Sequence, residues 1–431
     1  RQSLEQLGDH RLVQALLERE QQELWPVRHE LVQIGADWLE EARALLGRRA
    51  SHEAFRERLQ AGDASKDELV QLLDELLLDV EELEGRVPLV EERVEDARAF
   101  RAAWSEGAAG EAWMDCIAAV REHPAYDGLE LTPQRGLLPL WESASSGLWE
   151  FFVVGSGELP DVDLEFAIEE NPLREEDGVV LVLLPGGSFL MGASEELSGM
   201  SGFVPSMPLH EVELAPFFLS KYELTQAQWM RLDEGRNPSW YTPENPRALE
   251  HAGAEPLDPR HPVENVSWTE ARELLRRQDL QLPTEAQWEY ACRAGTESMF
   301  SYGDGRSDLD GAVNSAGSER TVVMAGAVDP WDDGWYRHAP VGSFRPNAFG
   351  LHEMHGNVQE WCEDQLIRGY DEVLRREGDG LDLRDDSQGE RIFRGGSFYH
   401  RIISGASALR RWGQPDQRFG DLGLRPARDL R

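Results

Sequence analysis

The 431-residue chain contains few cysteines for its length. Cys116, Cys292 and Cys362 lie far apart, with no CxxC pair, so the sequence provides no disulfide framework. Unpaired cysteines are typical of a reducing compartment, and we therefore expect a cytoplasmic protein. The chain also lacks a signal peptide and an apolar run of about 18 residues. These absences predict a soluble chain without a membrane span.

Basic residues are also scarce, because 43 Lys and Arg stand against 81 Asp and Glu, for a formal net charge of -38. Nucleic acid and anionic membranes both require a basic face, so neither is expected as a partner. An excess of acidic residues is typical of a solvated surface that keeps a protein soluble. Binding of cations or of a basic partner is the alternative explanation.

The composition divides the chain into three segments. Residues 1–124 are rich in Leu, Glu, Arg and Ala at helical spacing, which predicts helical hairpins with one interruption at Gly85 and Pro88. Either a coiled-coil arm for self-association or a packed helical domain fits this pattern. Residues 125–177 alternate apolar runs with turn residues, which predicts a β-rich connecting segment. The chain begins with Arg, so we expect a fragment of a longer protein.

The third segment, residues 178–431, is rich in Gly, Pro and Trp. VVLVLLPGGSFLMGA (179–193) predicts a hairpin, because a Pro-Gly-Gly turn separates two apolar runs. HEVELAPFFLSKYELT (210–225) predicts two strands that lead into a helix. Polar residues suited to the N-cap position precede three short helical patterns, and they are Thr225, Ser267 and Thr284.

Six motifs follow one another along this segment: GGSFLMG, HPVENVSW, LPTEAQWEYA, FGLHEMHGNVQEW, RGGSF and GLRPAR. Through them, residues 178–430 resemble the formylglycine-generating enzyme (sulfatase-modifying factor) family. The resemblance implies an α+β domain with the C-type-lectin-like formylglycine-generating-enzyme fold, preceded here by the N-terminal helical region. Residues 125–178 resemble the segment before such domains in bacterial chains with an upstream serine/threonine kinase. This chain has no kinase motifs of its own.

The resemblance also indicates where the family's chemistry belongs. In the enzymes of the family, two cysteines that follow the GGS segment hold copper and oxidise a cysteine of a client protein to formylglycine. The matching positions here are His400 and Gly405, so both thiols are missing. Copper(I) prefers soft thiolate ligands. We therefore expect a pseudoenzyme that binds no copper, with Cys292 and Cys362 as structural core residues.

Two enzymatic alternatives depend on histidines. A branch of the family that forms sulfur–carbon bonds needs an iron-binding histidine cluster in its N-terminal helices. The early histidines show no such cluster, since they are scattered over His10, His29, His52 and His123. An oxidoreductase with other metal ligands would use His400, helped by His352 or His355. The sequence shows no convincing convergent set of three ligands for it.

Calcium is the cofactor that the resemblance still implies for this chain. Ca²⁺ prefers clustered oxygen ligands, and the matching positions supply such oxygens. One implied site consists of Glu353, the backbone of His355, Asn357 and Glu360. A second implied site consists of Asn314, the backbone of Ser315, Asp333 and the backbone of Trp335. The alternative is that these residues cap turns and bind no metal.

The C-terminal segment YHRIISGASALRRWGQPDQRFGD (399–421) mixes framework-like residues with an irregular set. Nucleotide changes at the adenines of an Asn codon can produce each of these irregular residues. In this respect the segment resembles the variable proteins of diversity-generating retroelements, which place such variation on this fold to make a ligand-binding surface. The expected contact residues are Tyr399, His400, Arg401, Ile402, Ser404, Leu409, Trp412, Phe419 and Asp421.

The predicted function is therefore a binding module for a protein or small-molecule ligand. Two alternatives remain besides an enzyme. One is an ordinary family member whose pocket has drifted, and the other is a regulatory domain of a serine/threonine kinase.

Overall fold

The computed structural model describes residues 2–24, 31–61, 67–105, 108–160, 173–194, 206–245, 256–305, 308–316, 332–367, 369–370, 375–383 and 389–430. The chain forms two compact units that divide between Gly110 and Glu111. Within the described residues, no helix combines the length and the apolar character needed to cross a membrane.

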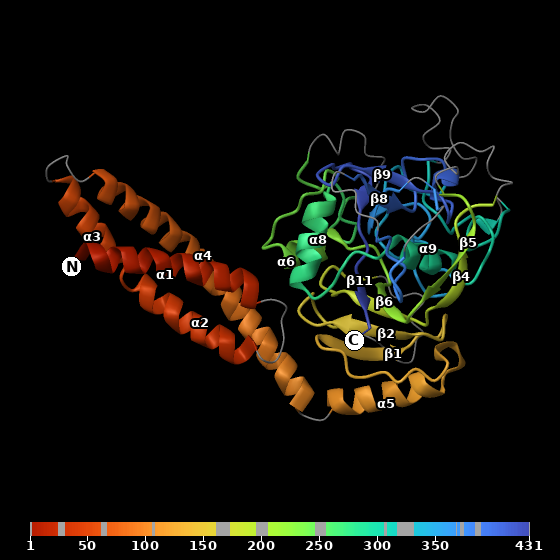
Figure 1. Cartoon of the computed structure of the whole chain (residues 1–431), viewed down its shortest axis with the longest axis horizontal. Helices are drawn as coiled ribbons and strands as arrows, with labels where there is room; N and C mark the ends of the chain where they lie inside the picture. The colour runs from red at the N-terminus through yellow and green to blue at the C-terminus, as the bar shows by residue number, and fades with distance from the viewer. Residues whose placement is uncertain are drawn as a thin grey trace. The chain divides into compact units, whose positions relative to one another are not determined.

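The first unit is a bundle of helices (Figure 1), namely α1 (Gln2–Glu23), α2 (Leu31–Leu46), α3 (Arg49–Gln60) and α4 (Asp67–Ser105). α4 packs against the other three helices. Trp38 of α2 is fully buried, and its indole N–H donates to the carbonyl of Leu16 over 2.8 Å. The unit is therefore a packed helical domain, one of the two structures that the sequence allowed.

α4 is continuous across Gly85 and Pro88, so the predicted interruption is wrong. A proline inside a helix removes one backbone hydrogen bond and usually kinks or ends the helix. Here Leu83 and Val90, on either side of the proline, are fully buried. Because helices in proteins are stabilised mainly by packing of their apolar face, this burial offsets the missing hydrogen bond.

A five-stranded sheet, ordered β1-β2-β3-β6-β11, forms the base of the second unit. Its strands are Leu137–Glu142, Trp149–Val153, Val180–Leu184, Phe217–Ser220 and Ala427–Asp429, and all neighbours are antiparallel. β1 and β2 come from the predicted connecting segment, where short strands were expected. They are integral to the main sheet, so this segment is part of the folded domain.

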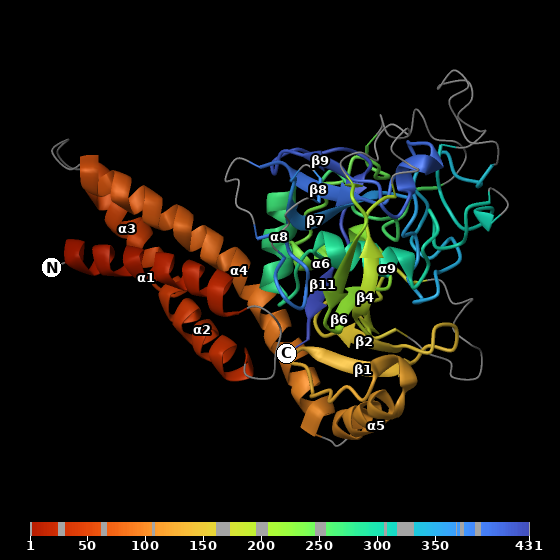
Figure 2. The ribbon, with the colours of Figure 1, turned by 45° about the vertical axis from the view of Figure 1, so that its right-hand side comes forward.

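Helix α5 (Ala108–Glu122) lies largely in the second unit, although the sequence assigned it to the helical region 1–124. The ring of Trp113 lies 5.6 Å from that of Phe151 on β2. Figure 2 shows α5 beside β1, as does Figure 1. The helix therefore belongs with the sheet that follows it along the chain.

Two smaller sheets complete the second unit. β4 (Gly187–Met191) pairs with β5 (His210–Leu214), while β7 (Gln359–Gln365), β8 (Arg391–Arg394), β9 (Arg411–Gly413) and β10 (Leu422–Gly423) form a sheet ordered β10-β7-β8-β9. β3 and β4 lie in different sheets, so the hairpin predicted over 179–193 is wrong. β3 is buried along its length between two other strands, and the chain leaves it through Gly186 and Gly187, whose φ angles are 71° and 109°.

The three predicted helices are α6 (Gln226–Leu232), α8 (Trp268–Arg277) and α9 (Glu285–Arg293). Thr225, Ser267 and Thr284 are their N-caps, as predicted, and each forms a complete capping box with the third residue of its helix.

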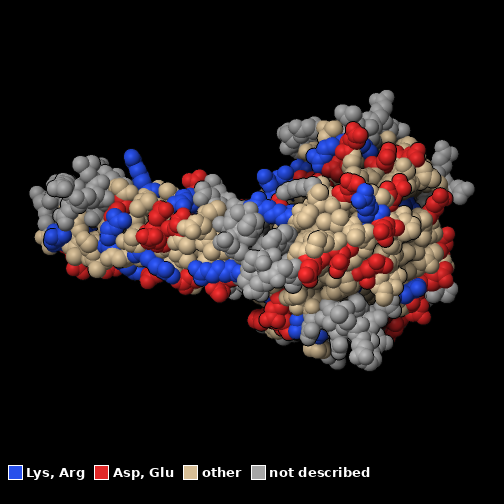
Figure 3. Space-filling view, turned by 90° about the horizontal axis from the view of Figure 1, so that it is seen from below, with Lys and Arg blue, Asp and Glu red and all other residues tan. Residues whose placement is uncertain are grey.

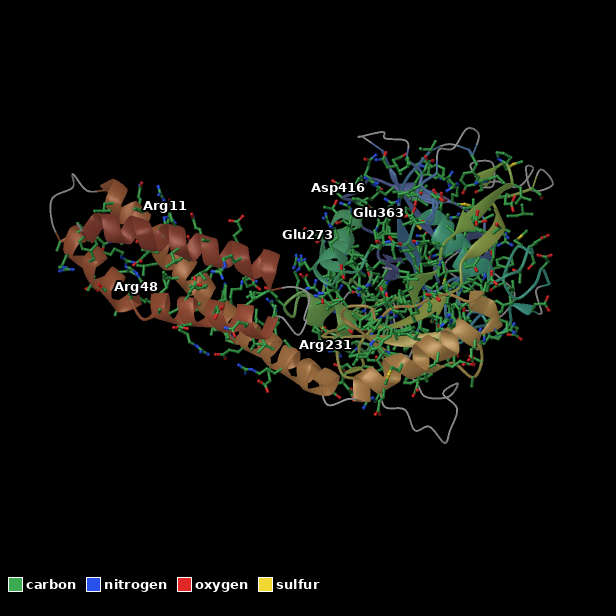
Figure 4. All side chains as sticks on the ribbon, turned by 60° about the horizontal axis from the view of Figure 1, so that its bottom comes forward. Arg11, Arg48, Arg231, Glu273, Glu363 and Asp416 are labelled. Atoms are coloured by element: carbon green, nitrogen blue, oxygen red, sulfur yellow. The ribbon has the colours of Figure 1, made fainter. Side chains whose placement is uncertain are left out.

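Acidic side chains are scattered over the face shown in Figure 3, with basic side chains between them, and Figure 4 shows the side chains of both kinds as sticks on the ribbon. This distribution agrees with a solvated acidic surface. A smaller number of charged groups pair in the core. Arg394 is fully buried between Glu285 and Glu289, at 3.0 and 2.6 Å, and Arg425 is fully buried against Glu360 at 2.8 Å.

Candidate functional site

The segment that leaves β8 is packed backbone to backbone. Gly395 and Gly396 have φ angles of 95° and 70°, and a Cβ on Gly396 would lie 2.7 Å from the amide nitrogen of Gly405. Gly405 ends the short 3₁₀ helix η7 (Ile402–Gly405). A Cβ at Gly405 would lie 2.7 Å from the carbonyl oxygen of Gly395. Gly405, the second of the two positions that carry cysteine in the enzymes of the family, therefore has room only for a hydrogen atom in place of a side chain.

The first of these positions, His400, belongs to a polar network. Its Nδ1 lies 2.8 Å from the hydroxyl of Ser397, and that hydroxyl donates to Oδ2 of Asp421 over 2.7 Å. Its Nε2 lies 3.1 Å from Nη1 of Arg411. Gln359 also donates to Asp421, over 3.2 Å. The carboxylate of Asp421 thus accepts hydrogen bonds from two side chains, Ser397 and Gln359.

These hydrogen bonds imply the protonation of the His400 ring. Ser397 donates its single proton to Asp421, so it accepts from Nδ1–H of His400, while Nε2 accepts from Arg411, which can only donate. Burial, and then the Arg411 charge, lower the pKa of His400 to about 4, although Asp421 acts in the opposite direction. The imidazole is neutral at pH 7, and neither nitrogen is open to a metal.

Several of the predicted contact residues reach the surface. Tyr399 is 48% exposed and Phe419 is 37% exposed, so both side chains present aromatic surface to solvent. Arg401 is exposed as well, and Ser404 and Trp412 are half-buried. His400 and Asp421 lie at the edge of this group, within the polar network described above.

Ile402 and Leu409, also predicted as contact residues, are core residues instead. Both are buried in an apolar cluster that includes Phe300 and Val313. Ile402 starts the 3₁₀ helix that brings Gly405 against the glycine pair, and its side chain faces the interior of the domain. An irregular segment without helical or strand periodicity gives no sequence signal for which side chains turn inward, so these two were misassigned.

Trp240 belongs to the same region but was not among the predicted residues. It is 43% exposed, and a Cβ on Gly420 would lie 3.7 Å from the Cβ of Trp240. The next residue, Tyr241, packs edge-on against Phe398 at 5.7 Å. Oε1 of the buried Glu264 accepts from the amide of Tyr241 over 2.8 Å and so holds the loop in place. The available signal was an aromatic pair inside the polar loop NPSWYTPEN (237–245).

Residues 167–430 match the family model of the sulfatase-modifying factor enzyme 1-like domain. The chain belongs to this family. A formylglycine-generating enzyme of Streptomyces coelicolor is 30% identical over 302 residues, which cover 58% of this chain and 88% of that protein. The serine/threonine-protein kinase pkn1 of Chlamydia pneumoniae is 30% identical over 243 residues, or 54% of this chain and 35% of that kinase.

Solved structures similar to this member of the sulfatase-modifying factor family include PvdO from Pseudomonas aeruginosa, with a TM-score of 0.48 at 24% identity, covering 60% of this chain and 98% of that one. Treponema denticola variable protein 1 has a TM-score of 0.45 at 20% identity, covering 58% of this chain and 96% of that one. The family assignment and the mixed helices and sheets confirm the α+β fold predicted from the motifs.

Two cysteines of this sulfatase-modifying factor family member lie in the matched domain outside the two thiol positions. Cys292 and Cys362 are buried, as expected of structural residues. Burial raises the pKa of the Cys292 thiol to about 12 and raises that of Cys362 well above its usual value. The thiolate is the form that binds metal and reacts, and burial disfavours that form at both positions.

The histidines considered as alternative metal ligands also have structural partners. Nδ1 of His355 lies 2.7 Å from the carbonyl of Gly405, and its Nε2 accepts from the amide of Ser301 over 3.1 Å. Nδ1 of His352 lies 2.8 Å from the carbonyl of Phe344. Within the described part of the chain, no three His, Cys, Asp or Glu side chains are arranged to hold a metal ion. A metal site built from His400 with His352 or His355 is not supported.

The first implied calcium site does not fit a cation, because its side-chain oxygens already have protein donors. Glu353 accepts from the amides of Gly342 and Phe344, at 3.0 and 3.1 Å. Asn357 accepts from the amide of Ala339 at 2.8 Å. Glu360 accepts from the indole of Trp288 at 2.7 Å and is paired with Arg425. The guanidinium group supplies the positive charge that a calcium ion would otherwise bring to Glu360, so calcium is not assigned to Glu353, His355, Asn357 and Glu360.

The second implied calcium site differs in one respect: although both oxygens of Asp333 have protein donors, the side-chain oxygen of Asn314 has none. Asn314 is fully buried, and its amide donates to the carbonyl of Arg337 over 2.9 Å, but its Oδ1 has no hydrogen-bond partner. Asp333 accepts from the amides of Ser315 and Trp335, at 2.9 and 3.0 Å, which brings its carboxylate to the same stretch of backbone. A buried acceptor left unsatisfied costs about 1–3 kcal/mol, which a bound cation would recover.

Proposed function

We propose that this member of the sulfatase-modifying factor family is a binding module for a protein or small-molecule ligand and not a formylglycine-generating oxidase. The observation that carries the proposal is the packing at Gly405, where a side chain of any kind meets the backbone of Gly395 at 2.7 Å. At the other position, both nitrogens of His400 are occupied by Ser397 and Arg411. The family's reactive pair is absent, and neither position offers a substitute.

The proposed binding face combines residues from two parts of the chain. Tyr399, Arg401 and Phe419 come from the C-terminal segment, and Trp240 comes from the loop after α6. Aromatic and Arg side chains dominate the binding energy of many interfaces, because they offer large contact areas and directional contacts. The half-buried Trp412 and Ser404 would complete the face. The polar network around His400 would support it from beneath.

With copper and a sulfatase-derived peptide that carries the target cysteine, this protein is expected to leave the peptide thiol intact. The relative from Streptomyces coelicolor, assayed in parallel, serves as the positive control. Mass spectrometry of the peptide measures loss of the thiol and gain of the aldehyde. Conversion of the peptide by this protein would contradict the proposal, because the missing thiols would then be dispensable.

The genes around this coding sequence distinguish a diversified binding face from a regulatory domain linked to a kinase. A diversified face requires a near-identical template repeat for residues 399–421, differing at adenines, beside a reverse transcriptase gene. The match to the kinase pkn1 supports a second candidate, a regulatory domain linked to a kinase. That candidate requires a kinase sequence in the same open reading frame upstream of Arg1. Both requirements are met or refuted by sequencing the locus.

We also propose calcium at Asn314, Ser315, Asp333 and Trp335, where it would stabilise the fold by joining two segments of backbone. Calcium at 100 times its dissociation constant is expected to stabilise the protein by about 2.7 kcal/mol. Thermal unfolding with calcium or with a chelator measures the effect. Asp333→Ala should abolish the calcium response, whereas Glu353→Gln, in the other implied site, should leave it unchanged. A response lost with Glu353→Gln but kept with Asp333→Ala would contradict the assignment.

A further inference from the structure

The second unit contains a cavity that plays no part in the proposed binding face. Its volume is about 350 Å³, within the range of about 300–1,000 Å³ that is usual for small-molecule sites. The residues that matter for its chemistry are Leu190, Leu209, Met299, Ala406, Glu297 and Asp304. They come from β4, from the approach to β5, from the region after α9 and from the residues after η7. The cavity is thus built from several distant parts of the chain.

The walls of the cavity are largely apolar. Leu190 is 40% exposed and Leu209 is 41% exposed, so two large aliphatic side chains stand open to solvent at the same site. Met299 and Ala406 line it as well, and both belong to or pack against a buried apolar cluster. An aliphatic group placed between these side chains would remove apolar surface from water on both sides, which favours binding.

The charge at the cavity is negative. Arg293 lines it, but its guanidinium donates to Glu289 over 2.8 and 2.9 Å and to the carbonyls of Gly192 and Ser298. Its charge is therefore compensated from within the protein. Glu297 and Asp304 are exposed, and neither forms an ion pair with any residue that the structure describes. One oxygen of Asp304 accepts from the amide of Met299 over 2.7 Å, and the other is left for a ligand.

We propose that this cavity binds a small alkylammonium ion. Its aliphatic chain would lie against Leu190, Leu209 and Met299, and its ammonium group would be placed by the carboxylates of Glu297 and Asp304. A carboxylate ligand is disfavoured, because the two acidic side chains repel it and most N–H donors of Arg293 are already used. The site differs from the proposed binding face in both its lining residues and its charge.

Hexylamine, which is protonated at pH 7, is the probe, with 1-hexanol as its neutral isostere and hexanoate as its anionic counterpart. Methyl-¹³C methionine labelling provides a local reporter, since Met299 lines the cavity and Met114 lies exposed on α5. Hexylamine is expected to shift the Met299 methyl signal saturably, to leave Met114 unchanged, and to bind about tenfold more tightly than 1-hexanol, a difference of about 1.4 kcal/mol. Hexanoate is expected to bind most weakly.

Two variants separate the contributions of charge and of space. In Glu297→Gln/Asp304→Asn, hexylamine and 1-hexanol are expected to bind equally. Ser194→Phe, at a half-buried position in the lining, should block both ligands. Leu159→Ala, at a 53% exposed position that does not line the cavity, is the matched control and should bind hexylamine as the unaltered protein does. Circular dichroism checks that every variant is folded.

Four outcomes would overturn the proposal. They are an unmoved Met299 signal, equal shifts at Met299 and Met114, equal affinity of the unaltered protein for hexylamine and 1-hexanol, and unchanged binding by folded Ser194→Phe. None of them bears on the proposed binding face, because Tyr399, Phe419 and Trp240 do not line the cavity. Failure here is therefore distinguishable from failure of the proposed function.

Discussion

A fragment of residues 108–431 is expected to fold as the second unit, whereas a fragment of residues 173–431 is expected to aggregate. The longer fragment keeps β1 and β2, which pair in turn with β3. β3 is buried along its whole length, so its loss of a neighbour would expose an apolar strand edge. Such edges recruit other chains and promote aggregation. Size-exclusion chromatography and thermal unfolding of both fragments measure the difference.

The buried ion pair between Glu150 and Lys221 provides a point variant for the same idea. Lys221 Nζ lies 2.8 Å from Glu150, and the two side chains are 9% and 1% exposed. Within 108–431, Glu150→Ala should cost about 3–5 kcal/mol of unfolding free energy, because it leaves the lysine buried without a partner. Glu150→Leu/Lys221→Met should recover most of that loss. The fragment prediction would be contradicted if fragment 173–431 were monomeric and unfolded at the same temperature as fragment 108–431. In that case β1 and β2 would not be needed for the stability of the sheet.

Gly405→Ala is expected to lower the free energy of unfolding by about 3 kcal/mol, the upper end for an overpacked site. The added Cβ would lie 2.7 Å from the oxygen of Gly395 and 3.4 Å from the amide nitrogen of Gly356. Both are backbone atoms, so neither moves as easily as the end of a side chain. Gly405 is not among the residues with positive φ, so the cost comes from contact and not from backbone strain. Urea unfolding measures it.

Gly420→Ala is the matched control for this prediction. Its Cβ would have its nearest neighbour at 3.4 Å, on the ring of Tyr241, which is close to an ordinary contact. We expect a change of about 0.5 kcal/mol or less there. The same reasoning predicts that His400→Cys/Gly405→Cys restores two thiols without restoring oxidation, since the second thiol distorts the backbone that should position it. Equal stability of Gly405→Ala and Gly420→Ala would show that position 405 accepts a side chain.

Features controlled by a few neighbouring residues were predictable from the sequence. Thr225 and Ser267 were recognised as N-caps, because a capping box needs only the cap and the residue three positions later. The family motifs identified the fold for a similar reason, since each is a short run of residues in a set order. His400 and Gly405 could be assigned to the empty thiol positions by counting along one such run.

Features that depend on distant partners were not predictable in this way. The run 179–193 has the pattern of a hairpin, but β3 pairs with β2 and β6. The local sequence does not reveal these distant partners. Ile402 and Leu409 share an irregular segment with the exposed Tyr399, and only tertiary packing separates them. Trp240 lies far from that segment along the chain. Its place beside Gly420 follows from the fold alone.

The position of the last strand has a consequence for synthesis on the ribosome. β11 (Ala427–Asp429) pairs with β6 (Phe217–Ser220), and Arg425 just before it donates to the carbonyls of Ser220 and Lys221, at 3.1 and 3.0 Å. The main sheet therefore cannot close until the chain has been translated as far as β11, about 200 residues after β6, and pairing over such long sequence separations is slow. A polypeptide released early would present the open edge of β6 to proteases. Closure of the main sheet thus depends on translation through Asp429.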